Sequence, residues 1–113
     1  MSFYTELHIR FTQFDEIDLS TQKQNILNLL AQDAIHQDIY QDLITAFTDG
    51  KSYLNVDPIY CFQLTKQIIS LFPNANIECR GLGEEFLYTW ILCVEDGSII
   101  FSNQPWENEN SYV

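Results

Sequence analysis

The chain has 113 residues, of which 46% are hydrophobic, and five basic side chains against sixteen acidic ones give a formal net charge of −11 at pH 7. This size and composition exclude a disordered or fibrous chain, because a domain of this length can bury a core without metals or disulfides. The charge argues against direct nucleic-acid binding, which depends on Lys and Arg neutralising phosphates. We therefore expect one domain spanning residues 1–113.

Targeting and redox signals indicate a cytoplasmic protein. No apolar run approaches the ~20 residues of a membrane span, and residues 1–6 show no basic flank followed by an apolar stretch. We expect no membrane partner. The three cysteines, Cys61, Cys79 and Cys93, lie among apolar neighbours, as buried structural thiols do in a reducing compartment.

The charge is unevenly distributed along the chain. Residues 1–49 carry −6, residues 50–80 carry +1 and residues 81–113 carry −6. Two interpretations stay open: a solvated surface that serves solubility, or a docking face for a basic protein.

The first element is a half-buried strand over residues 3–11, because apolar and polar side chains alternate there. Its second side carries Tyr4, Glu6, His8 and Arg10. This pattern predicts that the outer face of the sheet is partly exposed to solvent. A helix over residues 21–34 follows, with Ser20 as its N-cap. The helical pattern continues or restarts over residues 35–43, with Asp38 and Asp42 between its apolar positions.

Residues 44–56 are ambiguous, since Asp49-Gly50 is both a hairpin signal and a helix stop. We favour a helix end followed by a loop. Asp57-Pro58 then predicts a helix from Pro58 to residue 71 or 72, because Asp caps a helix and Pro suits its first turn.

The period then changes to two, which predicts strands over residues 77–80, 86–95 and 98–102, the last two joined by an Asp96-Gly97 hairpin turn. The segregation of strands and helices indicates an α+β fold. We expect an antiparallel sheet of about four strands with two or three helices packed on one face, in the order β-α-α-β-β-β. Residues 105–113 form a flexible acidic tail in this prediction.

Catalytic signals are sparse. His8 and His36 lack the spacings typical of metal ligands, so we expect no metal, cofactor or catalytic residue. The Gly81-Leu82-Gly83 segment does not fit a phosphate loop, because acidic residues and a strand follow it. We expect these glycines to allow a tight or positive-φ connection.

Candidate partner contacts combine acidic and aromatic side chains. In the strand over residues 86–95, one side is strongly aromatic, and large aromatics contribute disproportionately to interfaces. The alternative is that these aromatics are ordinary core, and the tryptophan of the tail either docks on a partner or folds back. The candidates are Asp38, Asp42, Glu84, Glu85, Tyr88, Trp90, Trp106, Glu107 and Glu109.

Three strings carry a family resemblance: VDPIYCF over residues 56–62, GLGEEF over residues 81–86 with Thr89-Trp90, and DGSIIFS over residues 96–102. Over residues 53–106 the chain resembles the small bacterial immunity proteins of contact-dependent growth inhibition and other polymorphic toxin systems. The resemblance implies a cytoplasmic protein that neutralises one cognate toxin domain, often a basic nuclease. It assigns no catalytic residues, and it assigns no contact residues because these vary from pair to pair.

We therefore expect a one-to-one protein inhibitor, monomeric in its complex, whose acidic side chains steer it to a basic toxin domain. Two alternatives belong to other classes. One is a small hydrolytic enzyme or ligand-binding protein that uses His8 or His36 with a carboxylate. The other is an adaptor subunit that associates with its own copy.

Overall fold

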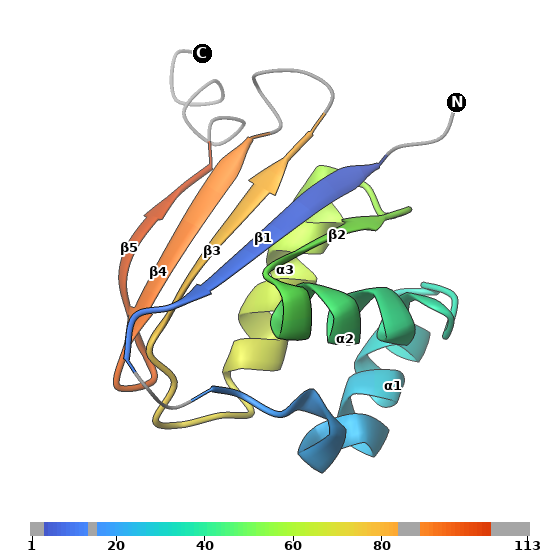
Figure 1. The fold of residues 1–113 in the computed structure, drawn as a ribbon. Helices are drawn as coiled ribbons and strands as arrows, with labels where there is room; N and C mark the ends of the chain where they lie inside the picture. Colours follow the sequence, from blue (N-terminus) through green and yellow to red (C-terminus); the bar gives the residue numbers. More distant parts are fainter. Residues whose placement is uncertain (1–3, 14–15, 84–88, 105–113) are drawn as a thin grey trace.

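The computed structural model describes residues 4–13, 16–83 and 89–104. Within these residues five strands form one antiparallel sheet in the order β2-β1-β3-β4-β5. The helices pack on one face of it (Figure 1), which confirms the α+β prediction. In chain order the elements are β1 (Thr5–Phe11), a 3-10 helix η1 (Leu19–Gln22), α1 (Lys23–Gln32), α2 (Ile39–Asp49), β2 (Lys51–Leu54), α3 (Pro58–Ile69), β3 (Ile77–Leu82), β4 (Trp90–Glu95) and β5 (Ser98–Asn103).

The core lies between the helices and the inner face of the sheet. Alternate residues of β1, β3 and β4 are buried, as period-two alternation requires of a sheet covered on one side. Apolar stripes on the three helices pack against them. Core side chains include Leu7, Ile9, Ile26, Leu30, Leu43, Phe47, Leu64, Ile68, Ile77, Cys79, Leu92 and Val94.

The structure has a strand, β2, after residue 50, where we expected a loop. Gly50 ends α2 in the left-handed conformation, with φ of 91°, as the sequence predicted. The chain then turns back beside β1, and residues 51–54 pair with residues 5–8. Tertiary pairing decides the outcome here, because so short a polar segment carries little strand signal of its own.

The helix boundaries differ in part from the predictions. Asp18 rather than Ser20 caps the first helical segment, since its carboxylate accepts hydrogen bonds from the backbone N–H and the hydroxyl of Ser20. The expected helix over residues 21–34 is a 3-10 turn followed by α1, and the pattern restarts as α2. Asp57 caps α3 as predicted, and α3 ends at Ile69.

The β4–β5 hairpin confirms the Asp96-Gly97 turn. Both residues have positive φ, 50° and 79°, as a two-residue turn of this kind requires. The Gly97 N–H donates to the Ala75 carbonyl at 2.9 Å, and a side chain at Gly97 would overlap the backbone of Pro73. The hairpin is therefore docked on the loop between α3 and β3. The strand before it begins at Trp90, and the earlier part of the expected strand over 86–95 lies mostly outside the described residues.

Gly81 has a role that the sequence prediction missed. It lies inside β3, not in a positive-φ connection, and it faces the indole of Trp90 on the neighbouring strand. A Cβ at residue 81 would overlap that ring. Trp90 is 2% exposed and meets Phe62 of α3 edge to face, with ring centroids 5.2 Å apart. The missing side chain thus makes room for the ring that joins the sheet to α3.

None of the helices in the described part of the chain has the length and apolar character needed to cross a bilayer.

Replacing Gly81 with Ala should lower the free energy of unfolding by about 1–3 kcal/mol, because the added methyl must displace the Trp90 ring. Urea unfolding monitored by tryptophan fluorescence measures the change. Ser102→Ala, at an exposed position of β5, serves as the control and should stay within about 0.5 kcal/mol. An unchanged stability for Gly81→Ala would contradict the close approach of the two strands' side chains.

Candidate functional site

The face of the sheet turned away from the helices, here called the outer face, carries an unusual share of the cations. Three of the chain's five basic residues lie on it: Arg10 on β1, Lys51 on β2 and Arg80 on β3. His8 lies there too, on β1. The acidic residues of the outer face within the described strands are Glu6, Glu78 and Glu95. This face is balanced in charge although the molecule as a whole is strongly acidic.

Two carboxylates on the outer face each contact two basic side chains. Glu78 accepts from Arg10 at 2.9 Å and from Arg80 at 3.1 Å, one partner for each carboxylate oxygen. Glu6 Oε1 lies 2.9 Å from His8 Nε2 and 3.7 Å from Lys51 Nζ. Arg10 and Lys51 reach their carboxylates from a neighbouring strand, whereas His8 and Arg80 lie two residues from theirs on the same strand and so share its face.

The carboxylates are less exposed to solvent than the basic side chains that they contact. The Glu78 side chain is 14% exposed, whereas those of Arg10 and Arg80 are 74% and 58% exposed. A molecule approaching this face from solvent therefore meets guanidinium groups first. The two ion pairs hold the pKa of Glu78 below its ordinary value, with the hydrogen bond from Arg80 as the largest cause.

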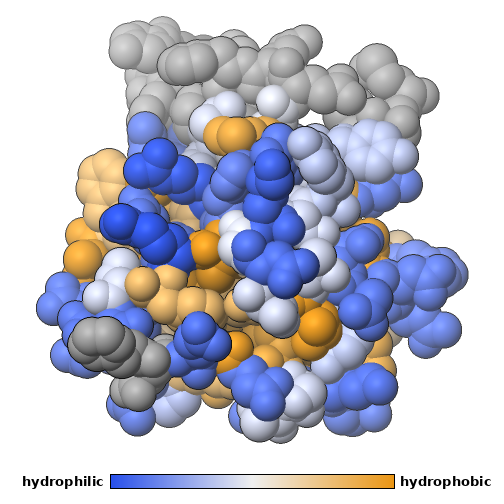
Figure 2. Space-filling model, in the orientation of Figure 1, coloured by the Kyte–Doolittle hydropathy of each residue, from blue (hydrophilic) through white to orange (hydrophobic). Residues whose placement is uncertain are grey.

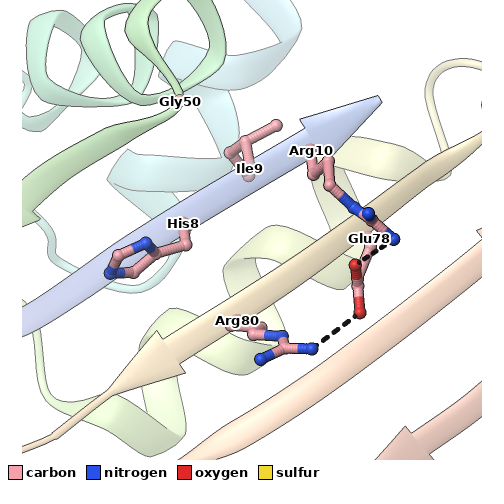
Figure 3. A pocket seen from close by; sticks show the side chains of 6 residues that line it. All are labelled: His8, Ile9, Arg10, Gly50, Glu78 and Arg80. Carbon is pink, nitrogen blue, oxygen red and sulfur yellow. Dashed lines mark hydrogen bonds and ion pairs between the residues drawn. The ribbon is translucent and has the colours of Figure 1, made fainter. Parts of the chain in front are cut away.

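A hollow of about 420 Å³ opens above these side chains. Its lining comprises His8, Ile9, Arg10, Gly50, Glu78 and Arg80. Figure 3 shows the guanidinium groups of Arg10 and Arg80 directed at Glu78 from two sides, with His8 on the neighbouring part of β1. We call this cavity the outer-face hollow.

The helix layer has the opposite charge balance. The described residues of the helices and the segments joining them carry seven acidic side chains against two basic ones, Lys23 and Lys66. The acidic side chains are Glu16, Asp18, Asp33, Asp38, Asp42, Asp49 and Asp57. Figure 2, which has the orientation of Figure 1, shows hydrophilic residues interspersed with apolar ones on the face that this view presents.

A second hollow, of about 300 Å³, lies where the α1–α2 connection meets the start of α3. Its lining comprises Asp33, Ala34, Ile35, His36, Ile39, Asn55, Val56, Asp57 and Tyr60. Two carboxylates and an exposed tyrosine ring make its rim suitable for a Lys or Arg side chain. We call it the helix-side hollow.

The candidates Asp38 and Asp42 lie at the start of α2, Asp38 just before the helix and Asp42 on its first turn, and their neighbours His36 and Ile39 line the hollow. Asp38 is exposed and Asp42 half-buried. Burial, and then the charge of Asp38, raise the pKa of Asp42. The structure thus places these two predicted contacts together in a region of negative potential.

The prediction that Trp90 contacts a partner is wrong. Its buried ring packs on Phe62 inside the molecule and cannot contact a partner without unfolding. The alternative interpretation of this residue as core is right. Its indole N–H, also buried, has no hydrogen-bond partner among the described residues. The other aromatic and acidic candidates, Glu84, Glu85, Tyr88, Trp106, Glu107 and Glu109, lie outside the described residues, as does the predicted flexible tail.

The histidines and cysteines bear on the enzyme alternative. His36 accepts a hydrogen bond from the Asp38 N–H at 3.1 Å and is exposed. Cys61 and Cys79 are buried as predicted, and burial raises the pKa of Cys61 to about 12, which disfavours a nucleophilic thiolate. Cys93 is only half-buried on the outer face, and its pKa is also raised. Among the residues that the structure describes, no group of three or more potential metal ligands comes together.

Sequence reasoning missed the outer-face hollow, although it placed His8 and Arg10 on one side of a strand. The missing information was the register, which sets Arg80 opposite His8 and Glu78 opposite Arg10. Comparisons of the chain with protein-family models, with curated proteins and with solved structures gave no match.

The ion pairs of Glu78 should make the protein sensitive to acid. Because the folded state lowers the pKa of this carboxyl, the stabilisation is present above the ordinary glutamate pKa and is lost as the pH falls through the lowered value. Glu78→Gln should reduce the free energy of unfolding by about 0.5–1 kcal/mol at pH 7 and flatten its decline between pH 6 and pH 3, as measured by urea unfolding.

The control is Glu95→Gln, which removes a carboxylate from the same face without breaking any ion pair identified among the described residues. It should leave the slope of stability against pH nearly unchanged. Equal acid sensitivity in Glu78→Gln and the unmodified protein would contradict the assignment.

Proposed function

We propose that this chain is an immunity-type protein that binds one cognate toxin domain and neutralises it without chemistry of its own. The partner is a domain with a basic surface, a nuclease being the first candidate. Binding is one to one, the chain acts as a monomer in the complex, and the site of action is the cytoplasm. The resemblance of residues 53–106 to immunity proteins of contact-dependent growth inhibition systems supports the class of protein.

The observation that carries this proposal is the charge partition between the two layers. Within the described residues, the helix layer has seven acidic and two basic side chains, whereas the outer face is balanced. A cationic partner is therefore attracted to one side of the molecule in particular. Complementary fields of this kind raise association rates toward about 10⁸–10⁹ M⁻¹s⁻¹ at low salt, which benefits an inhibitor that must bind before damage occurs.

The helix-side hollow supplies a place for the contact. A Lys or Arg side chain of the partner can enter between Asp33 and Asp57 with its stem against Tyr60. Asp38 and Asp42 extend the negative rim along α2. Arg and Tyr are among the residues that most often carry binding energy at interfaces.

The ligand-binding alternative has one observation in its favour, the outer-face hollow around His8. A hydrolytic enzyme has less support. The carboxylate in that hollow, Glu78, is fixed by two arginines and its pKa is lowered, whereas a general acid at neutral pH needs a raised one.

We expect the association rate with the basic toxin domain encoded next to this gene to fall as salt rises, because salt screens the attraction. The double variant Asp38→Asn/Asp42→Asn should associate several-fold more slowly at low salt and approach the unmodified rate at about 1 M salt. Stopped-flow fluorescence measures both.

The matched control is the double variant Glu6→Gln/Glu95→Gln, which changes the net charge equally but on the outer face. It should slow association less than the α2 variant does. A rate indifferent to ionic strength, or an equal effect of the two variants, would contradict steering by the helix layer. A neighbouring reading frame that encodes no toxin would remove the proposed function itself.

A further inference from the structure

The cations of the outer face form a row across three strands. In the register of the sheet, His8 of β1 lies between Lys51 of β2 and Arg80 of β3. Lys51 and Arg80 carry the fixed positive charges of this row, and His8 is charged only when it is protonated. Glu6 pairs with Lys51, whereas Arg10 and Arg80 share the single carboxylate of Glu78. The two arginines therefore keep one positive charge more than their carboxylate partner supplies.

The lining of the outer-face hollow has an excess of cationic groups. The guanidinium groups of Arg10 and Arg80 line it, together with His8, against the single carboxylate of Glu78. That carboxylate lies beneath the guanidinium groups and orients both of them (Figure 3). Each guanidinium carries five N–H donors, so an ion pair with one Glu78 oxygen leaves donors directed at the hollow and at solvent.

We propose that the outer-face hollow binds a phosphoryl group between Arg10 and Arg80, with His8 as a further donor. Both guanidinium groups are held at Glu78 and are largely exposed, and the donors that they do not use on Glu78 can pair with the oxygens of a phosphate. Glu78 is the positioning residue. Because it already fixes both arginine side chains in the unbound protein, binding a ligand costs less side-chain entropy.

The ligand is a small phosphate compound rather than a nucleic acid. A polyanion would need many phosphate contacts, and the helix layer of this acidic molecule repels it at long range. A single phosphoryl group needs only the local excess of positive charge. At about 420 Å³, the hollow has the size of a small-molecule site. Arg10 also lines a neighbouring hollow, together with Glu95. The part of the outer-face hollow near Arg80 and His8 is therefore its more positive side.

This site goes beyond the proposed inhibitor function and does not depend on it. The outer-face hollow lies on the sheet face opposite the helix layer, where a toxin domain bound to the helices would leave it open. Its test uses no toxin, so the two proposals fail separately.

Titration of the ¹⁵N-labelled full chain with inorganic phosphate, followed by NMR, tests the site. We expect saturable shifts of backbone amides in residues 8–10 of β1 and 78–80 of β3. Arg80→Gln and Arg10→Gln should each weaken binding about tenfold or more, since each removes charge-assisted hydrogen bonds. A parallel titration with AMP separates the sources: tighter binding of AMP indicates a nucleotide, and equal binding indicates free phosphate.

The matched control is Lys66→Gln, which removes the same charge from an exposed position of α3. It should change the affinity for phosphate less than twofold. The absence of saturable shifts with both phosphate and AMP would overturn the proposal, as would an equal loss of affinity in Lys66→Gln. Shifts of the same amides with an acidic peptide alone would overturn it in favour of a protein contact.

Discussion

The alternation of side chains along β1 and β3 is the constraint on which the account depends. Because the inner positions must fill the core under three helices, the charged residues of these strands all emerge on the other face. Three of the chain's five basic residues are collected there. The helix layer consequently retains most of the described acidic side chains with few partners. One geometric rule thus produces two surfaces of different chemistry in a domain of 113 residues.

The packing of Trp90 holds the sheet and the helix layer together. Its ring occupies the space left by Gly81 and meets Phe62, so β3, β4 and α3 are joined through one large side chain. The β4–β5 hairpin is held separately by the hydrogen bond from Gly97 to Ala75. Since β3 carries Glu78 and Arg80 on its other side, the rigidity of the core fixes the spacing of the groups that line the outer-face hollow.

Sequence reasoning recovered the parts of the fold that local patterns determine. The alternation of the first strand, the Asp57 cap and the Asp96-Gly97 turn were predicted and are confirmed. It missed β2, which exists because β1 offers an edge to pair with, and it misread Gly81, whose reason lies on another strand. For the site, it named Asp38 and Asp42 as candidate partner contacts but could not join residues of β1 to residues of β3, because strand register is a tertiary property.

The measurement that tests the separation of charge most directly is paramagnetic relaxation of the amide protons by two nitroxide probes of opposite charge. Attraction concentrates each probe where the surface potential is opposite to its own charge. We predict that the cationic probe relaxes amides of residues 33–42 more than the anionic probe does, and that this preference weakens or reverses for residues 8–10 and 78–80. The same ratio of relaxation rates on both surfaces would contradict the account.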